Sequence, residues 1–342
     1  MKRKLIFVAL AALAVIVCWR ILSCNSSKPV ISFYYWKTVF ELTEKEHQLL
    51  TDLEVKRLYI RYFDVVSLET GIMPSGIVQF KEKPSQEVVP VVYITNDAMS
   101  AYKGYPRNFA LADSVLQLIS NISAAEEIEF KEVQFDCDWT ESTEKEYFEF
   151  IDEIQKLDPE LIVTSTIRLH QVKYQERTGI PNVHSGTLMY YNMGRIAADS
   201  LNSIYDRDIA RQYIAGLDDY NLPLNIAVPV FSWGVQSRGN AVVDLLNKIY
   251  FNQLKSDTLF NQVSDRVFEA KHNGIFDDVY FAKGDRLKLE YASPEDIRTA
   301  IQDISEYLQE TPKEIILYDL DELNFENQLY EKDFFHSLCS SF

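Results

Sequence analysis

The sequence alternates between short apolar runs and longer stretches in which apolar residues recur at helical spacing. Eight runs are rich in β-branched and aromatic residues, and most are separated by about 25–40 residues, as a strand, a helix and two loops require. They span residues 30–36, 57–64, 88–95, 132–139, 161–168, 186–192, 224–233 and 314–320. Eight strand–helix units predict an α/β fold of the (β/α)8, or TIM-barrel, type. An open, doubly wound sheet is the alternative, although the glycine-rich first turn typical of that fold is missing.

Local signals place several helices and two irregular intervals along this pattern. Residues 43–46 form a capping box, and Ser293 followed by Pro294 marks another helix start. The interval 65–87 contains glycines and prolines and predicts a long loop. Between the seventh and eighth runs lie about 80 residues, where we expect helices near 241–254 and 259–271 and a small hairpin within 275–289. We interpret about 240–290 as an insertion at the barrel rim of a single domain spanning 30–342.

Composition limits the possible partners. The chain has 342 residues, with 34 Lys and Arg against 51 Asp and Glu, and a net charge of −17. So acidic a chain leaves no basic surface to neutralise phosphates, which argues against a nucleic-acid partner. Neither a GxxxxGK[ST] nor a GxGxxG motif is present, so no nucleotide cofactor is expected. Hydrophobic residues make up 47% of the chain, enough for a large core.

The N-terminus has the pattern of an export signal. Lys2, Arg3 and Lys4 precede an apolar run over 5–19, which is short for a membrane span and typical of a signal peptide. The following 21–24 (Ile-Leu-Ser-Cys) resembles the lipobox of bacterial lipoproteins, which implies a lipoprotein signal peptide over 1–24, lipidation of Cys24 and a short linker over 25–29. The alternative is an uncleaved membrane anchor. Both place the folded part outside the inner membrane, in the bacterial cell envelope.

Metal binding and disulfide bonding have little support in the sequence. Beyond the signal segment, Cys137 and Cys339 are far apart, and two isolated thiols are more consistent with this spacing than a disulfide. No Cys/His grouping suggests zinc, and the five histidines are not clustered, so we expect no metal site.

The fourth run carries two acidic residues on one face of its expected strand. Its odd-numbered residues are apolar or aromatic and should face the helices, whereas Gln134, Asp136 and Asp138 should point into the barrel. Two neighbouring carboxylates raise the pKa of at least one of them, which is how an acid catalyst is prepared. The other interpretation is a structural pair held by inward-facing Arg or Tyr residues.

Two short motifs resemble chitinase-like glycoside hydrolases. Residues 135–139 (Phe-Asp-Cys-Asp-Trp) are similar to the fourth-strand signature of that group, in which alternating aspartates lead to a glutamate that protonates the glycosidic oxygen while the substrate's acetamido group acts as nucleophile. Residues 189–192 (Met-Tyr-Tyr-Asn) resemble its sixth-strand motif. Together with 188–194, these motifs also look like an uncharacterised family of exported bacterial barrels related to those hydrolases. The resemblance would span residues 30–325.

The chain departs from the chitinase pattern at the acid. The glutamate should stand two positions after the last aspartate, where this chain has Thr140, which cannot act as a general acid. Three possibilities remain open: the loop turns Glu141 into the mouth, Asp138 takes the acid role, or the chitinase chemistry is absent. Asp319 or Asp321, at the end of the eighth run, could supply a second carboxylate across the barrel. Capping of the local turn is the other interpretation of these two aspartates.

Other strand ends carry groups that could bind a ligand. Arg168 could pair with the aspartates or clamp an anionic sugar, and Arg61 ends the second run beside Asp64. Aromatic rings at barrel ends can stack on sugar faces or simply pack. His170 could move protons near neutral pH, although a lone loop histidine is more often inert. The candidate binding residues are Trp36, Arg61, Arg168, Tyr191, Asn192, Trp233 and Asp319.

Two functions from different classes are consistent with these residues. The first is a lipid-anchored glycoside hydrolase that acts on a glycan by carboxylate chemistry, with Asp138 or Glu141 as acid and Asp136 tuning it. The second is a barrel that has lost its acid and binds a carbohydrate or a protein at the same mouth. Thr140 favours the second function, and the paired aspartates with the aromatic residues favour the first.

Overall fold

The structure, a computed structural model, describes residues 28–105, 110–325, 330 and 332–342. The expected signal peptide and Cys24 lie outside these residues. Within the described part of the chain, no helix is both long enough and apolar enough to cross a membrane.

Eight parallel strands form a closed barrel, as predicted. The first strand pairs with both the last strand and the second barrel strand (Phe33 with Leu317, Tyr34 with Tyr59), which closes the sheet and rules out the open alternative. Each barrel strand overlaps one of the eight expected runs. In spatial order around the barrel they are β1 (Val30–Tyr35), β3 (Arg57–Leu68), β6 (Glu87–Ile94), β7 (Glu132–Cys137), β8 (Ile162–Arg168), β9 (Ser185–Met189), β10 (Leu224–Pro229) and β18 (Glu314–Tyr318).

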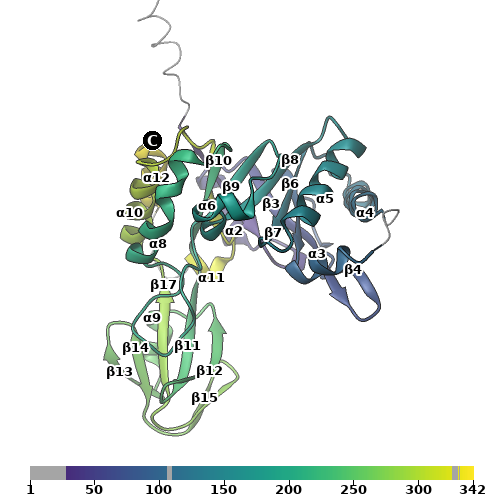
Figure 1. The fold of residues 1–342 in the computed structure, drawn as a ribbon. Helices are drawn as coiled ribbons and strands as arrows, with labels where there is room; N and C mark the ends of the chain where they lie inside the picture. The colour runs from purple at the N-terminus through teal and green to yellow at the C-terminus, as the bar shows by residue number, and fades with distance from the viewer. Residues whose placement is uncertain (1–27, 106–109, 326–329, 331) are drawn as a thin grey trace, which may run out of the picture.

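Helices follow most barrel strands and cover the outside of the barrel (Figure 1). Both expected capping signals are confirmed: Thr43 caps α2 with Glu46, and Ser293 caps α10 with Asp296. Apolar helix faces pack on the sheet, as where Phe150 meets Phe135 edge to face. The helices are α2 (Glu44–Asp52), α3 (Asn96–Tyr102), α4 (Leu111–Ala125), α5 (Glu144–Leu157), α6 (Leu169–Lys173), α7 (Gln175–Thr178), α8 (Arg207–Ile214), α10 (Pro294–Ser305), α11 (Glu322–Phe325) and α12 (Lys332–Leu338), with short 3-10 turns at Ala215–Asp219 and Cys339–Ser341.

The interval 65–87 is not the long loop that its glycines and prolines suggested. Strand β3 continues beyond the barrel and turns back as β4 (Gly71–Ser75), which pairs with it antiparallel. A short strand β5 (Gln79–Phe80) then pairs with β2 (Val39–Phe40). Gly71 has φ +127°, a backbone conformation that favours glycine and allows this turn.

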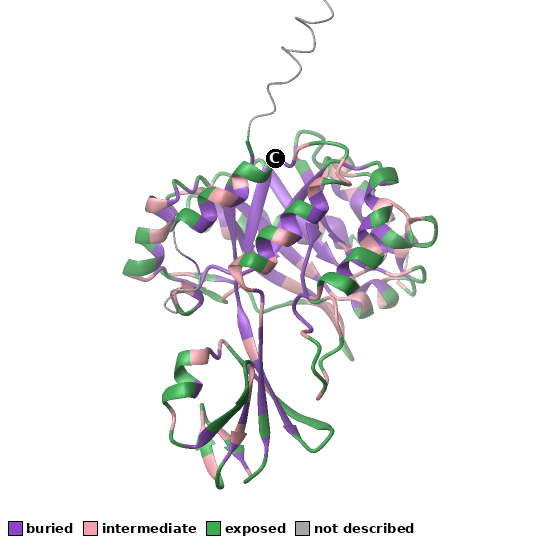
Figure 2. Cartoon of the chain, turned by 90° about the vertical axis from the view of Figure 1, so that its left-hand side faces the viewer, coloured by how far each residue is buried: buried purple, intermediate pink, exposed green. Residues whose placement is uncertain are grey.

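The insertion lies between the seventh and eighth barrel strands, as expected. The helix predicted near 259–271 is wrong, and of the one predicted near 241–254 only the end is helical, where it overlaps α9. The region consists mainly of a five-stranded antiparallel sheet with a separate small hairpin, and it projects from one end of the barrel (Figures 1 and 2). Its elements are β11 (Ser232–Arg238), β12 (Ala241–Asn247), α9 (Phe251–Ser256), β13 (Phe260–Ser264), β14 (Val267–Ala270), β15 (Gly274–Phe276), β16 (Val279–Phe281) and β17 (Arg286–Tyr291). It has a hydrophobic cluster of its own, which includes Phe268, Phe281 and Leu287.

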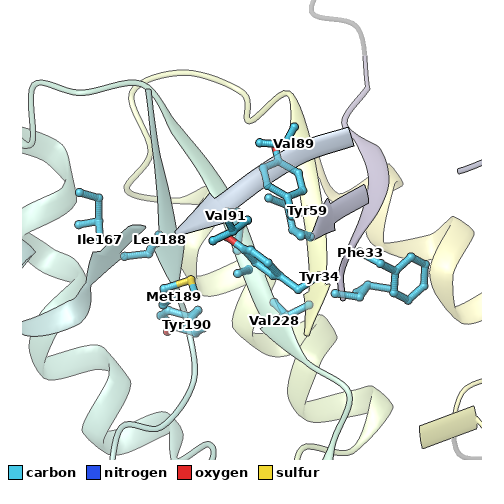
Figure 3. Packing of buried hydrophobic residues seen from close by; sticks show 14 of the residues in the cluster. Phe33, Tyr34, Tyr59, Val89, Val91, Ile167, Leu188, Met189, Tyr190 and Val228 are labelled. Atoms are coloured by element: carbon cyan, nitrogen blue, oxygen red, sulfur yellow. The ribbon is translucent and has the colours of Figure 1, made fainter. Parts of the chain in front are cut away.

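The barrel lumen is filled below its mouth. Tyr34 and Tyr59 are fully buried, and Figure 3 shows them packed with Val89 and Val91. The Tyr34 hydroxyl donates to Gln134 at 2.5 Å, and the Gln134 amide donates to Thr187 at 3.0 Å. At the N-terminal ends of the strands, Arg57 bridges Glu132 and Glu314 at 3.2 and 2.7 Å. The lumen is therefore occupied by packed rings and paired polar groups.

Candidate functional site

Up to its last residue, Cys137, strand β7 presents its side chains as the alternation predicted. Asp136 faces the lumen, where it accepts a 2.6 Å hydrogen bond from the Thr166 hydroxyl of β8. On the other face, Phe135 packs against α5, and Trp139, just beyond the strand, stacks on Tyr147 of α5 with ring centroids 4.9 Å apart. Asp138 lies past the strand end, and 41% of its side chain is exposed. Asp136 is therefore inside the barrel, whereas Asp138, which was also expected to point into it, lies at the rim because the strand ends before it.

A cavity of about 240 Å³ opens at the C-terminal ends of the strands, where active sites of such barrels lie. Side chains from most of the barrel strands, or from the residues just after them, line it; β10 contributes none. They are Trp36, Arg61, Asp64, Tyr93, Asp136, Arg168, Met189, Tyr191, Asn192 and Tyr318. Most of the residues predicted from the sequence to act at a site are thus brought together.

The guanidinium group of Arg168 interacts electrostatically with both Asp136 and Asp138. Arg168 donates through Nε and Nη2 to both carboxylate oxygens of Asp138. Burial raises the pKa of Asp136, and the negative charge of Asp138 raises it further, whereas Arg168 and the Thr166 hydrogen bond act in the opposite direction. The pKa of Asp136 is therefore raised on balance by its burial, and Asp138 lies in an ion pair with Arg168.

The loop after β7 does not bring Glu141 into the mouth. Glu141 accepts hydrogen bonds from Arg177 at 2.9 and 2.6 Å, and both side chains are largely exposed. The Thr140 hydroxyl lies 2.9 Å from that of Ser142, and its backbone N–H donates to Thr143, which turns the loop toward α5. The possibility that the loop points Glu141 inward is therefore not realised.

Aromatic rings form one wall of the cavity. Tyr191 stacks on Tyr318 with centroids 5.2 Å apart, and Trp36 lies 5.6 Å from Tyr318. The guanidinium of Arg61 lies over the Trp36 ring at 5.9 Å and is held by Asp64, with Nε to Oδ1 at 2.7 Å. Each arginine of the cavity is thus paired with a carboxylate.

Asn192 follows Tyr191 in a left-handed backbone conformation, with φ +55°. Asparagine tolerates this conformation better than most residues. The position matches the end of the sixth-strand motif, and the Asn192 side chain lines the cavity.

Trp233 and Asp319 are not among the residues that line the cavity. The Trp233 indole N–H donates to Glu290 at 2.8 Å, within the inserted sheet. Asp319 is buried and accepts a hydrogen bond from Asn324 at 2.9 Å, and burial raises its pKa. Both belong to the contact between the insertion and the barrel, where Lys248 also pairs with Asp321 at 2.5 Å.

His170 lies near the rim beside Asp138, outside the cavity lining, and burial lowers its pKa. Across the described ranges, no group of three or more His, Cys, Asp and Glu side chains is placed to hold a metal ion.

Besides Asp64, three lining residues were not among the predicted site residues: Tyr93, Met189 and Tyr318. Each stands at or next to the last position of its strand, β6, β9 or β18. Strict alternation of side chains, applied to the end of every strand, could have found them.

Comparison with solved structures places the fold among chitinase-like barrels. The spore cortex-lytic enzyme SleL of Bacillus cereus matches with a TM-score of 0.55 and 11% identity, over 92% of this chain and 75% of that one. A class V chitinase from Nicotiana tobaccum, solved with NAG4, matches with a TM-score of 0.56 and 10% sequence identity, over 92% of this chain and 99% of the chitinase. A chitinase from Bacteroides thetaiotaomicron matches with a TM-score of 0.56 and 10% sequence identity, over 92% of this chain and 97% of that chitinase. At sequence identities this low, the similarity shows a shared fold and nothing further.

No protein-family model matches the sequence, and comparison with curated proteins gives no match. The chain therefore has a closed (β/α)8 barrel of the chitinase-like type, and its chemistry has to be argued from its own residues.

Proposed function

We propose that this protein binds a glycan at the barrel mouth without cleaving it. The observation that carries the proposal is the arrangement of the residues at and next to the expected acid position. That position holds Thr140, Glu141 is paired with Arg177 outside the cavity, and Asp138 is paired with Arg168. A general acid must contact the glycosidic oxygen, and each of these two carboxylates instead contacts an arginine.

The cavity walls support a sugar ligand. Trp36, Tyr191 and Tyr318 offer apolar ring surface, and Asp64, Asp136 and Asn192 offer hydrogen-bond acceptors. Apolar walls with a few oriented polar groups are typical of small-molecule sites, and 240 Å³ is below the usual range of about 300–1,000 Å³. We therefore expect one sugar unit to enter. Three of the neighbouring structures were solved with NAG4, (GlcNAc)4 or (GlcNAc)3, which makes such oligomers the first probe to test.

The test measures binding of N-acetylglucosamine tetramer by calorimetry to the wild type and to two tryptophan variants. Trp36→Ala should weaken binding at least tenfold, about 1.4 kcal/mol, because it removes ring surface from the cavity. Trp233→Ala is the matched control and should bind like the wild type, because Trp233 is outside the cavity lining. Equal affinities in all three proteins would contradict the proposed site. Release of shorter oligomers by the wild type would contradict the absence of cleavage.

Hydrolysis with Asp136 as the acid is the second candidate, and its raised pKa favours it. This reaction would run at low pH and decline as the pH rises through the raised pKa, because the acid form is then lost. Turnover of a chromogenic glycoside that has this profile and disappears in Asp136→Asn would establish it. A flat zero rate from pH 4 to pH 8 would exclude it for that glycoside.

The proposed setting is the outer side of a bacterial membrane, with the protein anchored through a lipid on Cys24. The basic residues 2–4, the apolar run 5–19 and the lipobox-like 21–24 support this proposal. In a bacterial host, Cys24→Ser should release the protein from the membrane fraction and abolish incorporation of labelled fatty acid. Retention in the membrane would indicate the uncleaved anchor instead.

A further inference from the structure

The inference concerns how the anchored barrel stands on its membrane, and it rests on the proposed lipid on Cys24. The described chain enters the barrel directly. Pro29 is already buried, and the Val30 N–H donates to the Lys313 carbonyl at 3.0 Å, so the chain is fixed to the barrel immediately after Lys28. Only residues 25–27 separate Lys28 from Cys24. At no more than about 3.6 Å per residue, this tether reaches about 14 Å.

The tether and the mouth are at opposite ends of the barrel. Strand β1 runs from Val30, where the chain enters, to Tyr35, and the next residue, Trp36, lines the cavity. Six residues of strand at about 3.3 Å each place the cavity about 20 Å above the entry point. The inserted sheet follows β10 on the mouth side. In Figure 1 the inserted sheet projects away from the C-terminus. Cys339, close to the C-terminus, lies near Lys28, whose positive charge acts to lower the pKa of the Cys339 thiol.

We propose that the barrel stands with the N-terminal ends of its strands against the bilayer, so that the mouth and the inserted sheet point away from it. A tether of about 14 Å cannot span the roughly 20 Å from the entry point to the mouth, so the mouth cannot rest on the same membrane. Lying sideways is also disfavoured. The entry point lies inside the ring of helices, and crossing one helix uses about 10 Å of the tether.

Charge on the membrane-facing end is mixed and does not by itself set this orientation. Exposed lysines stand just before four barrel strands, at positions 28, 56, 131 and 313, and could meet anionic headgroups. Exposed acidic residues of the same loops, such as Glu54, Glu129 and Glu160, oppose them. The short tether is therefore the determinant, and the orientation should persist at high salt.

This orientation also selects the source of the glycan. A sugar carried on a headgroup of the anchoring membrane lies below the mouth, on the wrong side of the barrel. The ligand must instead approach from the aqueous side, as a polymer or a free oligosaccharide does.

The experiment measures energy transfer from a dye on the protein to an acceptor on lipid headgroups. The lipidated full-length protein is reconstituted in phosphatidylethanolamine–phosphatidylglycerol vesicles, in a Cys339→Ser background. One sample carries the donor at Lys131→Cys, before β7, and the other at Ile275→Cys, whose residue is 72% exposed in the small hairpin of the insertion. We expect transfer from position 131 to exceed that from position 275 several-fold, at low and at high salt.

A tether variant with about 20 glycine and serine residues added between Ser27 and Lys28 is the matched control. Its longer reach should reduce the difference between the two dye positions. Equal or reversed transfer in the normal-length protein would overturn the orientation while leaving the anchor intact. Failure of the protein to remain with the vesicles, scored separately by flotation, would overturn the anchor and the orientation together.

Discussion

At the scale of single residues, the decisive feature is a buried carboxyl group beside a paired arginine. The sequence predicted that Asp136 faces the lumen, because polar and apolar residues alternate so regularly along that strand. It could not predict that Arg168 would reach back to Asp138 rather than to a ligand, since two strands and a loop set that geometry. The sequence also left open whether Glu141 points into the barrel mouth, because the direction of a loop depends on contacts such as the one with Arg177.

The raised pKa of Asp136 leads to a prediction about stability. The folded state holds this proton more tightly than the unfolded state, so stability falls as the pH rises from the ordinary aspartate range through the raised pKa. Asp136→Asn removes the buried charge and can keep the bond from Thr166. It should therefore unfold about 1–2 °C higher than the wild type at pH 7, and the gap should close as the pH is lowered. Calorimetric scans at several pH values would measure this, and a gap that widens at low pH would contradict it.

At the scale of elements, the barrel strands were predictable and the inserted strands were not. The barrel strands are buried on both faces, so they stand out as continuous apolar runs. The inserted strand β12 is an edge strand with exposed Val242 and Val243, and its apolar residues happen to recur at helical spacing. Its pairing with β11 is a tertiary contact that local periodicity does not report.

The cap of α10 supplies a prediction at this scale. The Ser293 hydroxyl accepts the Asp296 N–H at 3.1 Å, and the Asp296 carboxylate in turn accepts the Ser293 N–H at 2.9 Å. Ser293→Ala should lower the free energy of unfolding by about 1 kcal/mol in urea titrations. Ser85→Ala, at a loop position, is the control and should change it little. Comparable losses in both variants would argue against a specific cap.

At the scale of the whole molecule, the barrel and the insertion have separate hydrophobic clusters but share a polar contact. Lys248 pairs with Asp321, and the Tyr250 hydroxyl donates to Asn324 at 2.6 Å. The two connections of the insertion leave the barrel side by side, because Ser232 pairs with Tyr291. The barrel core should therefore form without the inserted sheet.

Replacing residues 232–291 with a short glycine linker tests this organisation. We expect a soluble protein with the circular dichroism of an α/β barrel and cooperative unfolding. Its midpoint should be several degrees lower, because Asp321 and Asn324 lose partners. Lys248→Ala is the milder comparison and should lower the midpoint less. An aggregated or non-cooperative deletion variant would show that the two clusters fold as one unit.

The packed interior beneath the cavity determines how a ligand exchanges. Tyr34, Tyr59 and Gln134 fill the lumen, and Arg57 with its two glutamates closes its far end. The cavity is thus closed at its base by this packed interior. A polysaccharide therefore cannot pass through the barrel, and we expect only a chain end or a side branch to enter the cavity. Whatever enters must leave by the same route before the next unit can take its place.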